Sequence, residues 1–437
     1  MDRLLALPTS GESFLLQRGG KNILVDGGYG YRKLADTLAS PAVAVQHLDI
    51  VVCTHADMDH AGGLVGLLDM SAITVGEFWL PGEWGDVLPG LLQDPRGAMN
   101  GLLDELDGEP DWAKELGRHQ GEDRGEDADE ALAHGRLATE RLERGVNQRR
   151  EGVRASPERK ERREGLAWLT RQVSDVLVDD AKQTKAAARA FENATRRVQR
   201  QINNGQVREA WGTLFLHAIK TAKRIRDIAK QAIRHDVNVR WFDFQSFIKH
   251  RQADGGEPGL LVPLNAVELV EPPPSSTFLR FLTRLTPVNE QSLVFLSREA
   301  DGPLRRTIDV VFTADSPLGL GIDYVKSFLP KSEPGRCAIA TAPHHGSDNN
   351  RMAYNHLNQM VPVLLWVRSG GLQSHPGQEF RHLPVCQRAC TRCPHHAYQP
   401  SLVEIPLWSW PAGMRLPNPL LPRCFFIRGV KSHLCSC

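Results

Sequence analysis

The sequence predicts a layered α/β domain that is interrupted by a long helical insertion. Short apolar runs separated by glycines fill residues 1–84, and their order is strand, helix, strand. A highly charged stretch with few aromatic residues follows, after which strand-like runs resume near residue 237. We therefore expect both flanking parts to build one domain. The predicted boundaries are 1–84 and 236–380 for the two halves of this domain, 85–235 for the charged helical insertion, and 381–437 for a Cys- and Pro-rich extension.

Individual elements follow from apolar runs and from the glycines between them. Gly19-Gly20 predicts a tight turn between two strands, and Leu34 to Leu38 suits a short helix. The run at 48–53 is apolar except for Asp49, which is typical of a buried strand. The predicted strands are 13–16, 22–25, 48–53, 78–80, 237–242, 292–296, 308–313, 337–340 and 363–367.

The insertion divides into a charged part and a periodic part. Residues 105–165 are crowded with Glu, Asp, Arg and Lys, as in solvated helices or disordered segments. Apolar residues then recur at helical spacing from Leu166 to Leu177 and again from Val207 to Ile228. We expect two or more long helices here.

Composition excludes some classes of protein. With 41% hydrophobic residues the chain can bury a core, and a formal net charge of +1 gives no overall attraction to nucleic acid or to membranes. No apolar run approaches the roughly 20 residues that span a bilayer, and the first residues lack the layout of a signal peptide. Cys53 and Cys337 stand alone in apolar runs, as expected of reduced, buried thiols. These features predict a cytoplasmic protein without membrane contact.

A short polar loop carries several potential metal ligands. The segment Thr-His-Ala-Asp-Met-Asp-His, residues 54–60, directly follows the predicted strand at 48–53. Side chains on so short a loop can converge, whereas those on a strand alternate between faces. Imidazole nitrogens and carboxylate oxygens are ligands of zinc, manganese and iron. The alternative, a polar loop that merely caps the next helix, explains the spacing less well. The candidate ligands are His55, Asp57, Asp59 and His60.

This loop, followed by Gly62-Gly63, resembles the signature loop of the metallo-β-lactamase superfamily, whose commonest form carries His where this chain has Asp57. The Asp form resembles the branch typified by the hydrolase domain of the DNA-uptake protein ComEC. Further motifs match in the same order, outside the insertion and the extension. They are Ile23 to Gly28, Asn289 to Val294, Phe312 to Asp315, Ala342 to Ser347, and Ser374 to Pro376.

The resemblance implies a four-layer αββα sandwich with two divalent metal ions, zinc or manganese, in a cleft at one edge. It places His55 and Asp57 on one metal, Asp59 and His60 on the second, Asp315 between them, and His344 on the second site. Two such cations can activate a shared water and stabilise the oxygens of a displacement. Asp59 would also orient that water, and His345 and His375 would contact the substrate or protonate the leaving group.

One departure from the family pattern concerns a further metal-binding histidine between the loop and Asp315. No residue matches it by motif, and the histidines in that interval lie in charged, helical or linker stretches. The first metal site is therefore expected to be weaker or open, and Asp57 favours a harder cation such as manganese. The histidines in question are His119, His134, His217, His235 and His250.

Two further segments suggest binding roles. Residues 194–234 contain ten Arg and Lys against Glu209 and Asp227, and could form a basic helix that contacts nucleic acid, or a solvated face that packs on the domain, a protein partner or a second copy. In the tail, the spacing of Cys386, Cys390, Cys393 and His395 suits a structural zinc site, although an irregular extension with reduced cysteines is equally consistent with it.

The sequence thus predicts a metal-dependent hydrolase. The resemblance to the ComEC-like branch implies that its substrates are phosphodiesters, as for a nuclease or a nucleotide hydrolase. One alternative is hydrolysis of a small ester, amide or thioester. Another is a non-catalytic binding or scaffold protein that keeps the fold, because fold alone does not determine function.

Overall fold

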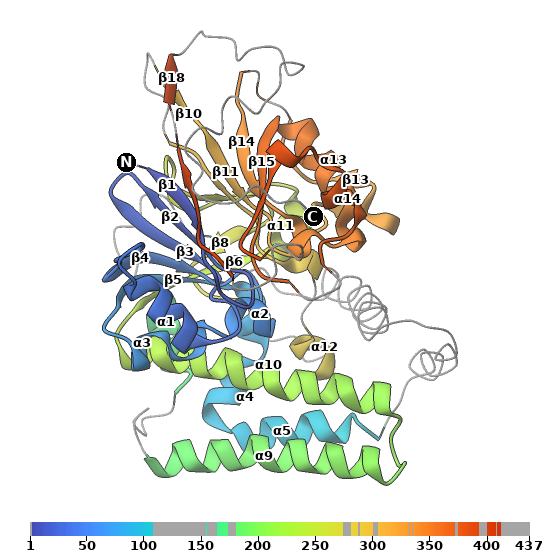
Figure 1. The fold of residues 1–437 in the computed structure, drawn as a ribbon. Coiled ribbons are helices and arrows are strands. Elements are labelled where there is room, and N and C mark those ends of the chain that lie inside the picture. Colours follow the sequence, from blue (N-terminus) through green and yellow to red (C-terminus); the bar gives the residue numbers. More distant parts are fainter. Residues whose placement is uncertain are drawn as a thin grey trace.

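The computed structural model describes residues 2–107, 154, 164–173, 181–273, 281–286, 289–299, 305–331, 333, 335–371, 375–392, 400–407 and 409–411. Two sheets pack face to face, and helices cover the outer face of each (Figure 1). This architecture confirms the predicted αββα sandwich.

The first sheet has eight strands in the order β17-β1-β2-β3-β4-β5-β6-β8. The hairpin β2–β3 turns at Gly19 and Gly20, whose positive φ angles of 58° and 77° suit glycine. Strands β3, β4, β5 and β6 run parallel, so their carboxyl ends meet at one edge. The strands are β17 (Val403–Pro406), β1 (Arg3–Ala6), β2 (Phe14–Arg18), β3 (Lys21–Val25), β4 (His47–Val52), β5 (Thr74–Pro81), β6 (Asn238–Asp243) and β8 (Val267–Leu269).

The second sheet has six strands in the order β16-β15-β14-β11-β9-β7. Its central strands β11, β14 and β15 are parallel neighbours, and β9 is antiparallel to β11. The strands are β16 (Arg388–Cys390), β15 (Val363–Arg368), β14 (Ala338–Thr341), β11 (Asp309–Phe312), β9 (Phe295–Ser297) and β7 (Val262–Pro263). Two small pairs lie outside the sheets: β10 (Arg305–Thr307) with β18 (Ser409–Pro411), and β12 (Gly319–Leu320) with β13 (Lys326–Ser327).

One core lies between the sheets, where alternate residues of both meet. Phe14 and Trp79 of the first sheet share this core with Phe295, Phe312 and Val367 of the second. A second core fills the space between the eight-stranded sheet and its helices, and a third lies between the six-stranded sheet and its own helices. The sheets therefore form a rigid platform that holds the loops at their edges.

Helices cover both outer faces (Figure 1). Those on the eight-stranded sheet include the longest in the described part of the chain, α9 and α10. The described helices are α1 (Tyr31–Ala39), α2 (Met58–Ala61), α3 (Leu67–Met70), α4 (Leu88–Gln93), α5 (Pro95–Asp104), α8 (Glu164–Arg171), α9 (Ala181–Asn203), α10 (Glu209–Arg234), α11 (Phe244–His250), α12 (Phe281–Leu285), α13 (Arg351–Met360) and α14 (Gln378–His382).

The described helices of the insertion pack on the sandwich and share a core with it. In the sequence these helices come between β5 and β6, which are parallel neighbours in the sheet. Helix α10 contributes Trp211, Phe215 and Ile225 to the same core as the sheet's outer face. Figure 1 shows α4, α5, α9 and α10 stacked together at this side of the molecule. No helix in the described ranges has both the length and the apolar character needed to cross a bilayer.

The structure corrects two predictions. The basic segment 194–234 is not one helix, because the chain turns between Asn203 and Glu209, where Gly205 has a φ of 66°. The tail from residue 381 is not wholly outside the sandwich, since β16 pairs with β15 and β17 pairs with β1. Cys390 of β16 is buried in the core against α13, Cys386 lies in the turn before it, and Cys393 and His395 fall outside the described residues.

Candidate metal centre

Five loops meet at one edge of the sandwich, and each follows a strand. The β1–β2 loop carries Glu12, and the loop after β4 carries His55 to His60. Asp315 follows β11, His344 and His345 follow β14, and His375 lies beyond the end of β15. Because the parallel strands of each sheet end at the same edge, residues more than 300 positions apart become neighbours.

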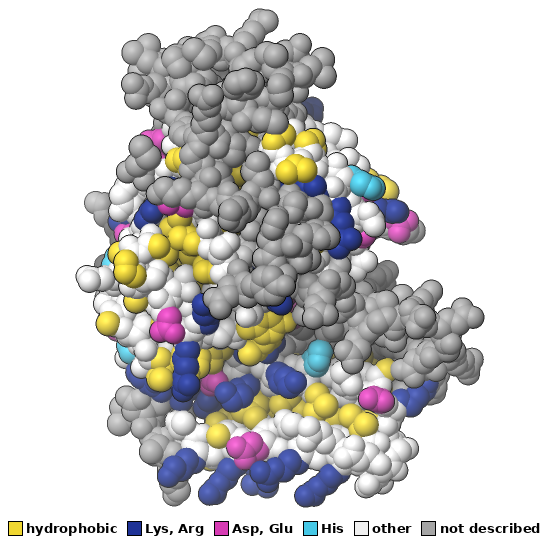
Figure 2. Space-filling view, viewed as in Figure 1, with side chains coloured by type: hydrophobic (Ala, Val, Ile, Leu, Met, Phe, Trp, Pro, Cys, Tyr) yellow, Lys and Arg dark blue, Asp and Glu magenta, His cyan; other side chains and the backbone are white. Residues whose placement is uncertain are grey.

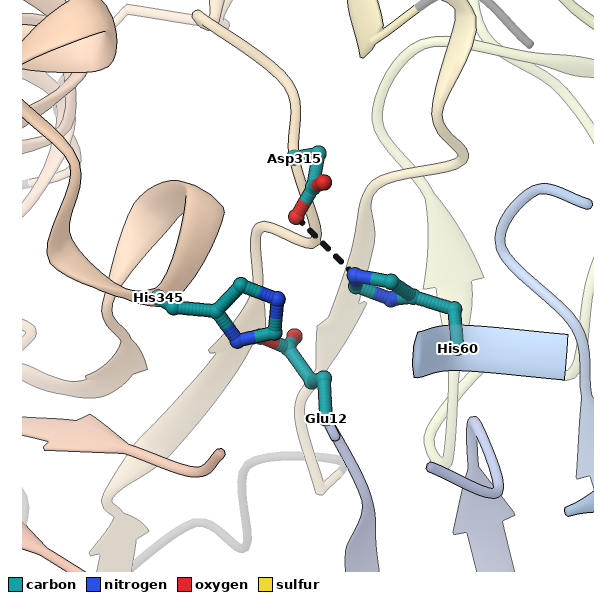
Figure 3. Close-up of side chains that lie close together, drawn as sticks. All are labelled: Glu12, His60, Asp315 and His345. Atoms are coloured by element: carbon teal, nitrogen blue, oxygen red, sulfur yellow. Dashed lines mark ion pairs between the residues drawn. The ribbon is translucent and has the colours of Figure 1, made fainter. Parts of the chain in front are cut away.

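One cluster contains Glu12, His60, Asp315 and His345, all of them buried (Figure 3). One potential ligand atom from each lies within 4.8 Å of those of the other three. His60 Nε2 is 3.1 Å from Asp315 Oδ1, and His345 Nδ1 is 3.6 Å from Glu12 Oε2. Figure 3 shows the four side chains pointing toward one another from four separate segments.

A second cluster contains His55, Asp57 and Asp315. His55 Nε2 lies 3.5 Å from Asp57 Oδ2 and 3.6 Å from Asp315 Oδ2. The other oxygen of Asp315 faces His60 of the first cluster. Asp315 thus belongs to both clusters and presents one carboxylate oxygen to each.

The ring orientation of the three buried histidines is fixed from behind. His60 Nδ1 donates to Asp26 Oδ2 at 2.7 Å, and His345 Nδ1 donates to the Ser369 carbonyl at 2.9 Å. His55 Nδ1 lies 3.0 Å from the Thr54 hydroxyl, which itself donates to Asp26. His55 and His60 thereby present Nε2 to Asp315, whereas His345 Nε2 lies 2.9 Å from Asp59 Oδ2. This is the arrangement by which proteins set the tautomer of metal-binding histidines.

The residues present fit a metal. Four buried atoms, Glu12 Oε2, His55 Nε2, His60 Nε2 and Asp315 Oδ1, have no hydrogen bond of acceptable geometry in the described part of the chain. Leaving buried polar atoms without such bonds is destabilising unless another partner satisfies them. A cation at each cluster would satisfy all four and would account for the concentration of carboxylates.

The pKa values of the clustered side chains follow from their burial and from their mutual charges. Burial raises the pKa of Glu12 to about 8. Burial alone would lower the pKa of His55, but the carboxylates of Asp315 and Asp57 outweigh it and raise that pKa to about 9. Burial likewise opposes the shift at Asp315, whose pKa is nevertheless held well below its usual range, chiefly by His60 and His344. Protons therefore compete with metal for these ligand atoms.

The structure places three predicted residues differently from the roles assigned by resemblance. Asp59, predicted as a metal ligand, joins neither cluster in the described part of the chain. His345, predicted to contact substrate, is only 2% exposed and lies in the first cluster. His344, predicted as a ligand, has a side chain 21% exposed with Nε2 3.7 Å from Asp315 Oδ2. Both have positive φ angles, 48° and 52°, so the turn directs them apart in a way that the sequence does not reveal.

Asp59 and His375 border the clusters. Asp59 Oδ2 lies 2.9 Å from His345 Nε2, and its side chain is 24% exposed. The His375 ring centre lies 5.8 Å from that of His344 and 6.0 Å from that of His345. Both residues are therefore beside the clustered ligands and on their more open side.

Sequence reasoning missed Glu12 and the role of Asp26. The signal for Glu12 is the preceding Gly11: a Cβ there would lie 2.0 Å from the Asp59 carbonyl oxygen, and Glu12 N donates to that same oxygen at 2.7 Å. Gly63 makes a similar close approach, with 2.0 Å between its Cβ position and the Gly27 oxygen. These glycines bring the β1–β2 loop, the end of β3 and the loop after β4 into contact.

The additional candidate ligand lies before the loop at residues 54–60 in the sequence, and not between that loop and Asp315. No histidine between His60 and Asp315 joins either cluster in the described residues. His235 instead bonds Asp69 at 2.8 Å, His217 and His250 lie on α10 and α11, and His119 and His134 fall outside the described ranges. Glu12, which precedes the loop at residues 54–60, is the additional candidate ligand in the first cluster.

Comparison with known proteins is consistent with a metal centre at these residues. Residues 7–127 match the family model of the metallo-beta-lactamase superfamily. No curated protein matches the chain. The matched segment contains Glu12, Asp26 and the loop from His55 to His60, and the sandwich is that expected of the metallo-β-lactamase fold. Members of this superfamily are generally metal-dependent hydrolases, and the residue clusters here could hold metal.

We expect Asp26→Asn to weaken metal binding by about 10- to 100-fold, the usual effect of losing a hydrogen-bond partner behind a metal-binding histidine. The amide can donate to His60 Nδ1, which would move the imidazole proton to the Nε2 atom that faces the cluster. Competition with a chromogenic chelator measures the affinity. Asp49→Asn, on β4 but paired with Lys21, is the matched control. Equal affinities for both variants would contradict the role of Asp26.

Proposed function

We propose that this protein hydrolyses phosphodiester bonds with two divalent metal ions. The observation that carries the proposal is the position of Asp315, which offers one carboxylate oxygen to each of two clusters of ligand atoms. When bound, paired cations lower the pKa of a shared water and stabilise the oxygens of an in-line displacement.

The chain's own residues divide into holding and reacting groups. Glu12, His60 and His345 would hold one cation, His55 and Asp57 the other, and Asp315 both. Asp59 would accept a proton from the attacking water and orient it, because its carboxylate borders the cluster and is partly exposed. His344, more exposed than His345, is the better candidate to contact the substrate, together with His375.

The donor set favours phosphate chemistry. Glu12, Asp57 and Asp315 give the two clusters as many carboxylates as imidazoles, and hard oxygen ligands suit manganese as well as zinc. Paired metal sites of this kind recur in phosphatases and nucleases. The resemblance of the Asp57-containing loop to the ComEC-like branch supports the same substrate class.

The test uses purified full-length protein, dialysed against chelator and reloaded with manganese or zinc. We expect metal-dependent cleavage of bis(p-nitrophenyl) phosphate and of single-stranded DNA or plasmid. Asp59→Ala should lose activity by about 100-fold or more, as expected when a general base is removed. Asp36→Asn, an exposed residue of α1, should leave it unchanged.

Other outcomes would overturn the proposal. Cleavage of p-nitrophenyl acetate or of a thioester, with no phosphodiester cleavage, would assign the centre to small-molecule esters. Metal binding without turnover of any of these substrates would favour a binding or scaffold protein. Phosphodiester cleavage that Asp59→Ala leaves intact would show that Asp59 is not the base.

A further inference from the structure

Helix α10 belongs to the insertion, and one of its arginines contacts the loop at residues 54–60. Arg224 Nε donates to the Ala56 carbonyl at 2.8 Å. Ala56 stands between His55 and Asp57, the two residues that this loop contributes to the second cluster. The loop continues into α2, which lies beside α10 (Figure 1). The insertion therefore reaches the candidate metal centre through its backbone.

Arg224 points into the protein and is held there on several sides. Figure 2 shows Lys and Arg side chains gathered over the two long helices, but Arg224 is only 9% exposed. Besides its bond to Ala56, its guanidinium donates to the Thr221 hydroxyl at 3.0 Å and to Met58 Sδ at 3.5 Å. A planar guanidinium with three partners has a fixed orientation. Arg224 is therefore a fixed contact between α10 and the loop.

The four backbone carbonyls of residues 54–57 each accept a hydrogen bond. Three of the donors belong to the sandwich or to α2: Leu293 N donates to Thr54 at 3.0 Å, the Cys53 thiol to His55 at 3.1 Å, and Ala61 N to Asp57 at 2.7 Å. The fourth donor is Arg224, on the carbonyl of Ala56. A buried carbonyl without a donor is unfavourable. The insertion thus completes the set of bonds that fixes this part of the loop.

The same face of α10 also holds the chain that continues from the loop. Gln231 Nε2 donates to the Leu64 carbonyl at 3.1 Å, and Arg234 Nη1 lies 2.8 Å from both carboxylate oxygens of Asp69. Arg224, Gln231 and Arg234 recur at helical spacing, so they share one face of the helix. Helix α10 therefore supports the chain from the loop at residues 54–60 to α3.

We propose that Arg224 is a positioning residue for the metal ion of the second cluster. By bonding the Ala56 carbonyl, it keeps the side chains of His55 and Asp57 close to Asp315. The first cluster has separate support, because His60 Nδ1 bonds Asp26 at the end of β3. This role rests on the two-metal centre of the proposed function but not on its substrate.

Arg226 provides a matched control on the same helix. It is 8% exposed, and its Nε also donates to a backbone carbonyl, that of Leu91 in α4, at 3.0 Å. It lies 3.7 Å from Asp227 as well, and neither cluster contains a residue of α4. Replacing either arginine leaves a buried carbonyl without its donor, so a general loss of stability should be at least as large for Arg226→Met as for Arg224→Met.

Calorimetric titration of the metal-free full-length protein with manganese tests the proposal. The native protein should bind two ions. Arg224→Met should weaken the binding of one ion by about tenfold, at the low end of the effect of losing a partner behind a metal ligand. The other ion, and both ions of Arg226→Met, should bind as in the native protein. Asp57→Asn removes a ligand of the second cluster, and adding Arg224→Met to it should cause no further loss.

Further variants separate position from charge. Arg224→Lys keeps the charge but loses the planar fork, so it should weaken the same ion. If a Met variant fails to fold, Arg224→Lys and Arg226→Lys are compared in the same titration. Equal affinities of the Arg224 and Arg226 variants would overturn the proposal, as would tighter binding by Arg224→Met, which would show that the charge of Arg224 only repels cations. Two bound ions without phosphodiester cleavage would instead refute the proposed hydrolysis and leave the role of Arg224 intact.

Discussion

Asp315→Asn is expected to abolish metal-dependent activity and to lower the metal content of the purified protein. The substitution keeps the shape of the side chain but removes the charge that faces His60 Nε2 at 3.1 Å and His55 Nε2 at 3.6 Å. Loss of a group behind a ligand already weakens metal sites by 10- to 100-fold. Loss of the carboxylate common to both clusters should therefore exceed about 100-fold in activity. Elemental analysis and cleavage of bis(p-nitrophenyl) phosphate measure the two effects.

The control must separate ligand loss from damage to the fold. Asp36→Asn makes the same Asp-to-Asn substitution on the surface of α1, and this variant should retain both metals and activity. The circular dichroism of Asp315→Asn should match that of the native protein, because the backbone of Asp315 keeps its bond from Asn350 at 2.7 Å. A folded Asp315→Asn protein with full metal content would show that this carboxylate is not a ligand.

Much of the sandwich follows from local pattern. The apolar runs predicted as strands at 48–53, 308–313 and 363–367 correspond to β4, β11 and β15, each buried on both faces. Strands buried in this way stand out as continuous apolar segments bounded by polar loops. Their order along the chain was enough to predict a layered α/β domain.

The strands that escaped prediction are short and derive their stability from distant partners. β1 lies at the start of the chain and pairs with β17, so Leu4 lies opposite Ile405. β16, with the sequence Arg-Ala-Cys, is held by pairing with β15. Three or four residues give no measurable period, and the pairing that defines these strands is invisible to any local window.

The candidate site shows the same division between local and distant information. The loop from His55 to His60 is compact in sequence and could be recognised from spacing alone. Glu12 is a single carboxylate in a turn, and only the tertiary approach of Gly11 to Asp59 brings it to the centre. Which of His344 and His345 faces the first cluster depends on the backbone angles after β14. These angles cannot be read from the neighbouring residues in the sequence.

Arg240→Met is expected to be the most destabilising substitution away from the metal centre. Arg240 on β6 is 6% exposed and is surrounded by three carboxylates. Its guanidinium donates two bonds to Glu268, at 2.7 and 2.6 Å, and one to Glu257 at 2.7 Å, and it lies 3.2 Å from Glu77. It also stacks over Trp79, 4.6 Å from the ring centre. Removing the cation leaves partly buried carboxylates that repel one another, which lowers the free energy of unfolding by about 3–5 kcal/mol.

Urea denaturation measures this effect, and two further variants identify its cause. Arg3→Met breaks a more exposed pair with Glu404 and should lower the free energy of unfolding by less than about 1 kcal/mol. Adding Glu268→Gln to Arg240→Met should restore part of the loss, because the uncompensated charge, and not the missing methylenes, is responsible. If Arg240→Met were no more destabilising than Arg3→Met, the carboxylates around Arg240 would have to be solvated or protonated in the folded protein. Such a result would contradict a network of charged, paired side chains around Arg240 that joins β5, β6 and β8.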